Sequence, residues 1–162
     1  MEHELSNTDL QEAATDTVAF VDEYSSFVSM HHTDAAGVVY VGHPIQWAQV
    51  GMENLFRAAG HPIETLGQAP IHYPMVRLDI NHWGKLRLGD PLRVRSFVSH
   101  VGNRSFTVRT QVISNDSIRV TVDMTGVAVG RDDTMPRAED WLRELHDLAQ
   151  LHGLVGTKEE RS

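Results

Sequence analysis

The chain has 162 residues, a formal net charge of −8 and no cysteine, which fits one domain with its own hydrophobic core. The absence of cysteine excludes disulfides, a thiol nucleophile and a Cys-ligated metal, and the acidic balance argues against general nucleic-acid binding. With neither a secretory leader nor an apolar run of about 18 residues, we expect a soluble, cytoplasmic protein without a membrane segment.

The N-terminal third begins with a polar, acidic stretch. Residues 1–17 lack a periodic apolar pattern, so we expect an N-terminal arm outside the domain. Residues 18–30 contain partly alternating apolar side chains and predict a long first strand. A small-residue loop then carries a lone acid, Asp34, and leads into an apolar, strand-like run from Val38 to Val41.

A helix is predicted next, from Pro44 to about residue 59. Pro44 suits a first helical turn, and Gly60 suits the C-terminal cap. Gly51 lies in the middle of the helix, where it indicates close packing against another element. The apolar residues of the segment recur at helical spacing and form a single stripe: Ile45, Ala48, Met52, Leu55, Phe56 and Ala59.

The second half of the chain predicts an antiparallel sheet. Residues 60–70 have turn composition, and strands are expected at 72–83, 91–101, 104–114 and 117–129. Their alternation is typical of a sheet with one buried face, and the helical stripe needs such a face. The pattern therefore indicates an α+β fold, with four strands in antiparallel succession after the helix. A last helix is predicted at 138–151, within a C-terminal segment at 138–162.

Asp34 has two interpretations from the residues alone. An aspartate beside glycine most often caps backbone N–H groups of its own turn, and this structural role is favoured without further information. A carboxylate shortly before a helix can also attack a carbonyl carbon or activate water, while free N–H groups of the helix start polarise the carbonyl oxygen.

Three motifs resemble the 4-hydroxybenzoyl-CoA thioesterase branch of the hotdog-fold superfamily. Residues 33–40 (TDAAGVVY) are similar to its aspartate loop, residues 86–90 (LRLGD) to its Gly-Asp turn, and residues 102–106 (GNRSF) to its hairpin turn. The resemblance covers about residues 20 to 137. It implies a hotdog domain at 18–137, in which a long antiparallel sheet wraps around one central helix, with the C-terminal helix as an addition.

The resemblance also implies an activity, the hydrolysis of an acyl-CoA thioester to a free acid and coenzyme A, with no further cofactor. It makes Asp34 the nucleophile or general base, and this reverses the preference for a capping role. The thioester oxygen would be held by a backbone N–H near the helix start, at Val41 or the adjacent Gly42. Thiolate is a good leaving group, so one carboxylate and an oxyanion site can suffice.

Candidate substrate contacts lie around this loop. Tyr40 ends the matched motif, while His32 and His43 replace residues that differ in many relatives. His32 could pair with Asp34 and lower its pKa, or belong to a surface loop. His43 could hydrogen-bond the substrate or be an exposed residue at the helix start. Gln49 stands where the hydroxybenzoyl-specific enzymes have an acid, which argues against 4-hydroxybenzoyl-CoA itself.

Coenzyme A contacts are implied at the hairpin turn, at Arg104 and Ser105. A guanidinium suits phosphate recognition, although a solvated turn arginine is an equal interpretation. Lys85, Arg87 and Arg137 could add local positive charge, but the sequence does not place them beside Arg104. The ten histidines lack the spacing of a built metal site, so no metal is expected, and no G-x-S-x-G elbow supports a serine hydrolase.

Alternative functions remain open at this stage. One is a thioesterase acting on acyl-carrier-protein or polyketide thioesters, and another is a non-catalytic module that binds acyl thioesters on the same fold. The resemblance further implies a homodimer at minimum and a homotetramer as an extension, with sites at the subunit interface. Asp34 would then work with Arg104 or the 72–83 segment of a neighbouring subunit.

Overall fold

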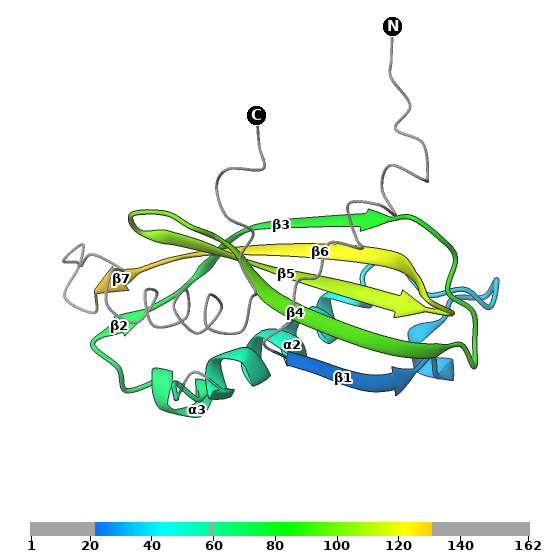
Figure 1. The fold of residues 1–162 in the computed structure, drawn as a ribbon, viewed down its shortest axis with the longest axis horizontal. Coiled ribbons are helices and arrows are strands. Elements are labelled where there is room, and N and C mark those ends of the chain that lie inside the picture. Colours follow the sequence, from blue (N-terminus) through cyan, green and yellow to red (C-terminus); the bar gives the residue numbers. More distant parts are fainter. Residues whose placement is uncertain (1–21, 59, 131–162) are drawn as a thin grey trace, which may run out of the picture.

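A computed structural model describes residues 22–58 and 60–130. One helix lies across one face of a five-stranded antiparallel sheet, whose strand order is β1-β4-β5-β6-β3 (Figure 1). The strands are β1 (Asp22–Phe27), β3 (Met75–His82), β4 (Pro91–Val101), β5 (Ser105–Ser114) and β6 (Ser117–Val127). This arrangement confirms the predicted α+β hotdog fold. The expected arm at 1–17 and the expected helix at 138–151 lie outside the described residues.

The central helix, α2 (Pro44–Ala58), packs mainly on β4 and β5. Gly60 has a φ of +82°, and the N–H of His61 donates to the carbonyl of Phe56 at 2.8 Å, so the helix ends in the predicted glycine cap. Gly51 makes the expected close approach, because a Cβ added there would lie 2.0 Å from Ser96 Oγ.

The core lies between α2 and the inner face of the sheet. Strand residues alternate between buried and partly exposed along β4, β5 and β6, as the sequence pattern predicts. Ser96 and Thr110 are fully buried under the helix and share a hydrogen bond of 2.8 Å. The largest fully buried side chains are Phe56, Phe106, Leu55, Leu92, Val28, Val94, Val108, Val112 and Val120.

Two parts of the predicted strand pattern are wrong. The expected strand 72–83 is divided into β2 (Ile71–His72) and β3, and the end of the expected strand 117–129 is divided into β6 and β7 (Val129–Gly130). Strands β2 and β7 form a separate two-stranded sheet. Pro74 lies at the first break and has no N–H to donate to a ladder. The predicted order of the strands is also wrong at β3. A simple succession would place β3 beside β4, but β3 pairs with β6 at the edge of the sheet.

Two local predictions also need correction. The run from Val38 to Val41 is not a strand; Val38 and Val39 form only isolated bridges, to Arg87 and Thr33, and Val41 is 58% exposed. A short helix, α3 (Ile63–Leu66), follows Pro62 inside the segment expected to consist of turns. A short 3-10 helix, η1 (Met30–His32), lies after β1.

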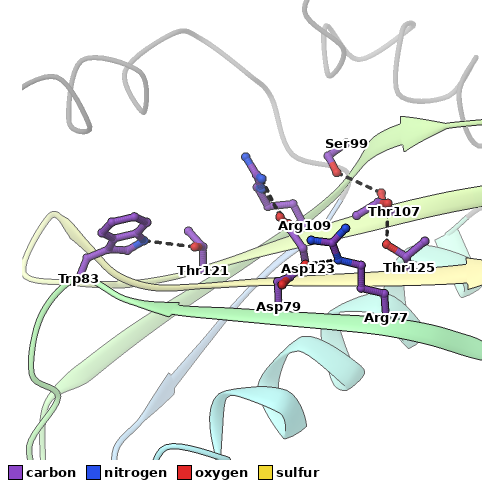
Figure 2. A network of polar contacts seen from close by, with 9 residues as sticks. All are labelled: Arg77, Asp79, Trp83, Ser99, Thr107, Arg109, Thr121, Asp123 and Thr125. Atoms are coloured by element: carbon purple, nitrogen blue, oxygen red, sulfur yellow. Dashed lines mark hydrogen bonds and ion pairs between the residues drawn. The ribbon is translucent and has the colours of Figure 1, made fainter. Parts of the chain in front are cut away.

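The outer face of the sheet is polar (Figure 2). Arg109 donates two hydrogen bonds to Asp123, at 2.8 and 2.6 Å, and this pairing raises the pKa of Arg109. The hydroxyls of Thr107 and Thr125 lie 2.9 Å apart across β5 and β6. These side chains satisfy one another on the face away from α2.

Candidate functional site

Asp34 lies in a tight, exposed turn. Its backbone N–H donates to the carbonyl of Val38 at 2.9 Å, and Gly37, with a φ of +71°, donates to the carbonyl of Asp34 at 3.0 Å. The Asp34 carboxylate accepts the N–H of Ala36 at Oδ1, at 2.8 Å. No described residue hydrogen-bonds the other oxygen, Oδ2. The side chain thus fulfils the capping role with one oxygen and keeps the second available.

The Gly-Asp turn at residues 86–90 anchors this loop. Val39 donates to the carbonyl of Leu86 at 2.9 Å, and Leu88 donates to the carbonyl of Gly37 at 3.4 Å. Inside the turn, Asp90 Oδ2 accepts the N–H of Arg87 at 2.8 Å. The turn motif therefore has a structural role in this chain, because it fixes the Asp34 loop at the entrance to β4.

The segment between the loop and α2 presents two free backbone donors. Tyr40 and His43 use their N–H groups, the first on the carbonyl of His32 at 2.9 Å and the second on the carbonyl of Tyr40 at 3.0 Å. Between them, the N–H groups of Val41 and Gly42 have no acceptor among the described residues. Two adjacent free N–H groups can bind an oxyanion. Both are positions for which the family resemblance implies an oxyanion contact.

His32 is buried, with 8% of its surface exposed, and packs against the ring of Trp47. Its Nδ1 accepts the backbone N–H of Ser29 at 2.9 Å, so the proton of the neutral ring lies on Nε2. Burial, followed by the charges of His31 and His43, lowers the pKa of His32. His32 therefore faces the core as a neutral ring, and the described residues contain no pairing of His32 with Asp34.

Tyr40 and His43 flank Val41 and Gly42 in the chain. The rings of His43 and His32 are 5.3 Å apart, and those of His43 and Tyr40 are 6.4 Å apart. The Nδ1 atom of His43 is buried without a hydrogen-bond partner. Tyr40 is 56% exposed. The part of the chain that the structure describes holds no group of three potential metal ligands.

Gln49 lines a cavity of about 510 Å³ between α2 and the edge strand β3. Its amide donates to Glu53 on the next helical turn at 3.2 Å. The other lining residues are mostly apolar, and three are methionines: Ile45, Met52, Met75, Val76, Arg77, Leu78 and Met124. The sequence does not reveal this cavity, because periodicity shows which residues are apolar but not where a sheet edge leaves a gap beside a helix.

Arg104 and Ser105 lie at the opposite end of the sheet from Asp34. They belong to the hairpin between β4 and β5, whereas the Asp34 loop is tied to the turn that precedes β4. Strand β4 has 11 residues, and at about 3.3 Å per residue it spans about 33 Å. One chain therefore does not bring Asp34 and Arg104 together. Their cooperation requires a second copy.

Comparison with known proteins places this geometry in a family. The model of the thioesterase-like superfamily matches residues 28–145, which include the Asp34 loop, α2 and all five strands from β3 to β7. The chain is also 26% identical, over 96 residues, to a 1,4-dihydroxy-2-naphthoyl-CoA hydrolase from Crocosphaera subtropica. That alignment covers 59% of this chain and 70% of the hydrolase.

Solved structures share the fold. A gentisyl-coenzyme A thioesterase superposes with a TM-score of 0.67 at 19% identity, over 75% of this chain and 99% of that one. A 1,4-dihydroxy-2-naphthoyl-CoA thioesterase from Synechocystis superposes with a TM-score of 0.69 at 18% identity, over 78% of this chain and 96% of the other. No helix in the described ranges is long and apolar enough to cross a membrane.

Proposed function

The chain belongs to the thioesterase-like superfamily, and we propose that it is an acyl-CoA thioesterase that hydrolyses its substrate to a free acid and coenzyme A. Membership confirms the thioester-hydrolase class predicted from the sequence. The observation that carries the proposal is the placement of a carboxylate with a free oxygen, on Asp34, close in the chain to two adjacent free N–H groups, at Val41 and Gly42.

The chemistry follows from these groups. The N–H groups of Val41 and Gly42 stabilise the negative charge that develops on the thioester oxygen. Asp34 either attacks the carbonyl carbon, which gives a mixed anhydride that water then hydrolyses, or takes a proton from the attacking water and passes it to the thiolate. The carbon–sulfur bond breaks, and the thiolate leaves without a strong acid to protonate it. The products are the carboxylic acid, which gains the water oxygen, and the thiol of coenzyme A.

The cavity beside Gln49 is our candidate for the acyl group. Its volume of about 510 Å³ lies within the range of small-molecule sites, and its wall is mostly apolar. Methionine side chains adapt their shape and make favourable contacts with aromatic rings. The relatives named above act on 1,4-dihydroxy-2-naphthoyl-CoA and gentisyl-CoA. We therefore propose an aromatic acyl group, with the Gln49 amide as the polar contact within this pocket.

A second copy of the chain completes the proposed site. Strand β3 is a sheet edge and exposes apolar side chains, with Val76 at 61% and Leu78 at 44%. An unpaired edge of this kind invites pairing with another strand. Antiparallel pairing of two β3 strands sets the His82 end of one copy beside the Met75 end of the other. Met75 pairs with Gly126, which pairs with Phe106 beside the Arg104 hairpin.

In this arrangement the Arg104 hairpin of one copy approaches the Asp34 loop of the other. Arg104 and Ser105 then contribute to coenzyme A binding across the interface. Tyr40 and His43 remain candidate substrate contacts beside the oxyanion donors. We propose the dimer as the minimal active unit, and a dimer of dimers as its extension.

Hydrolysis of a panel of CoA esters tests the proposal. Aromatic, short-chain and long-chain esters are supplied to the native protein, and the free thiol is followed with a thiol reagent. The chain has no cysteine, so the protein adds no background signal. We expect turnover that is highest on aromatic esters. Turnover of aliphatic esters alone would contradict the assigned acyl pocket, and the absence of hydrolysis of every ester would contradict the function.

A further inference from the structure

Strand β3 carries one cation and one anion on the outer face of the sheet. Arg77 donates to Asp79 Oδ2 at 2.6 Å, and the two side chains are 71% and 45% exposed (Figure 2). On β6, Asp79 lies opposite another acid, Asp123, which is itself paired with Arg109. Because β6 is the one neighbour of β3 in the five-stranded sheet, the open side of the Arg77–Asp79 pair is the sheet edge.

The two edges of this sheet differ in charge. Strand β1, at the other edge, carries Asp22 and Glu23 and no cation, so two β1 strands side by side would bring only acids together. Strand β3 has charges of both signs beside the exposed Val76 and Leu78. Each copy has a net charge of −8, so two copies repel overall and need complementary charges at their contact. Of the two edges, β3 offers such a contact to a second copy of this chain.

The charges of β3 distinguish between the registers that a two-fold axis allows near residues 77–80. The axis must pass through a residue, because opposing residues then lie on the same face and both helices stay on one side of the joined sheet. An axis at Arg77 or at Asp79 would place like charges opposite each other. An axis at Ile80 would place Asp79 opposite Asn81, which has no charge. An axis at Leu78 places Arg77 of each copy opposite Asp79 of the other.

We propose that two copies pair through β3 on a two-fold axis at Leu78, with Arg77 of each copy paired to Asp79 of the other. Leu78 pairs with the buried Met124 on the helix side of the sheet, so in this register two Leu78 side chains meet on that side. Opposite charges and apolar side chains directly across antiparallel strands both stabilise the pairing. The register rests on the dimer of the proposed function. Since Leu78 lines the cavity assigned to the acyl group, the second copy borders that cavity.

Charge reversal tests the register through the mass of the assembly. Asp79→Arg and Arg77→Asp each place like charges across the axis. We expect each to raise the dissociation constant of the pair about a hundredfold or more, which gives half the native mass in light scattering after size exclusion. An equimolar mixture of the two variants should recover the native mass, because each supplies the charges that the other lacks. Glu64→Arg is the matched control: it reverses an acid of an exposed ion pair on α3 and should keep the native mass.

Cysteine variants test the same register without changing a charge. The chain has no cysteine, and directly opposite residues of antiparallel strands lie within the reach of a disulfide. Leu78→Cys should therefore link two copies under mild oxidation, as a dimer on a non-reducing gel. Ile80→Cys is the control, because in this register its two thiols are offset by about 13 Å along the strands and should not link.

The register would be overturned by the native mass in both charge variants, or by a mixture that stays at half the native mass. A disulfide in Ile80→Cys, none in Leu78→Cys, or a monomeric native protein would overturn it equally. None of these readouts depends on turnover. A protein that shows the expected masses but hydrolyses no thioester keeps the register and loses the proposed function. An active protein whose mass no variant changes keeps the function and loses the register.

Discussion

Asp34 has a capping role in the structure and a catalytic role in our proposal, and from the residues alone these two roles are alternatives. Its Oδ1 accepts the N–H of Ala36, which is the structural interpretation, while Oδ2 has no partner in the described residues, which leaves it available for chemistry. A carboxylate held through one oxygen loses rotational freedom before the substrate arrives. Such preorganisation favours the transition state, because the ordering cost is met during folding. The turn hydrogen bond and the proposed catalytic role therefore support each other.

His32 should make the stability of the fold depend on pH. Its folded-state pKa is lowered, by burial first and then by His31 and His43, so in mildly acidic solution the unfolded chain binds its proton more readily than the folded chain. The free energy of unfolding should fall as the pH drops through the unfolded-state value of about 6.5 toward the folded-state pKa, and recover as the pH rises. His32→Gln keeps an acceptor for the N–H of Ser29 but removes the titration.

Thermal unfolding at pH 7.5 and pH 5.5 measures this effect. We expect the decrease in Tm between the two pH values to be smaller in His32→Gln than in the native protein. His72→Gln, at an exposed histidine in β2, is the control and should show the native decrease. An equal decrease in His32→Gln and the native protein would show that His32 does not carry the pH dependence.

At the scale of elements, the contact between α2 and the sheet depends on the absence of a side chain at Gly51. Alanine in place of glycine within a helix normally stabilises it by about 1 kcal/mol. Here the added Cβ would lie 2.0 Å from Ser96 Oγ and would disturb the buried hydrogen bond to Thr110. Gly51→Ala should therefore lower the free energy of unfolding, by about 1–3 kcal/mol.

Urea denaturation measures the free energy of unfolding of Gly51→Ala, with Gly67→Ala as the control. The comparison separates the effect of close packing at Gly51 from the general effect of replacing glycine with alanine. Gly67 has a φ of −58° and no atom within 4 Å of an added Cβ, so its substitution should be neutral or stabilising. A Gly51→Ala protein as stable as the native protein would mean that the helix moves away from the sheet at little cost.

The sequence predicted helices and strands well where their apolar residues recur with a regular period and pack against a single core. This holds for the apolar stripe and the glycine cap of α2 and for the alternation in β4 to β6. In each case the pattern depends only on burial within one chain. It failed at residues 73–74, where Pro74 divides a run of apolar residues that otherwise looks continuous, and at β3, whose neighbour in the sheet is decided by packing. The Asp34 loop was identified only through its resemblance to a family, because its residues alone favoured a capping turn.

The site is less predictable than the fold for a related reason. The unpaired N–H groups of Val41 and Gly42 depend on which carbonyls the neighbouring residues occupy, and composition does not show this. The distance between Asp34 and Arg104 depends on the length and direction of β4.

At the scale of the whole molecule, the exposed edge of β3 predicts an oligomer. The chain has a mass of 18.1 kDa, so we expect light scattering after size exclusion to give twice that mass or a multiple of the dimer. Leu78→Asp places a charge on the apolar edge and should give a monomer that keeps its circular dichroism. The readout is the mass rather than turnover, because Leu78 also lines the proposed acyl cavity.

Phe27→Asp is the matched control for the oligomer. Phe27 is 62% exposed on β1, the opposite edge of the same sheet, so this variant should keep the native mass and activity. A Leu78→Asp protein with the native mass, or a native protein that is monomeric and fully active, would contradict a site shared between two copies.

The most direct test of the account is the kcat/KM of Asp34→Asn on the best ester of the CoA panel. Asparagine keeps an oxygen for the N–H of Ala36 but removes the charge, so the turn should survive while the chemistry does not. We predict a loss of about two orders of magnitude or more, a usual cost of removing a key catalytic group. Asp116→Asn, at a 96% exposed side chain of the β5–β6 turn, should retain native activity. Native kcat/KM in Asp34→Asn would contradict the assignment of Asp34 as the nucleophile or general base.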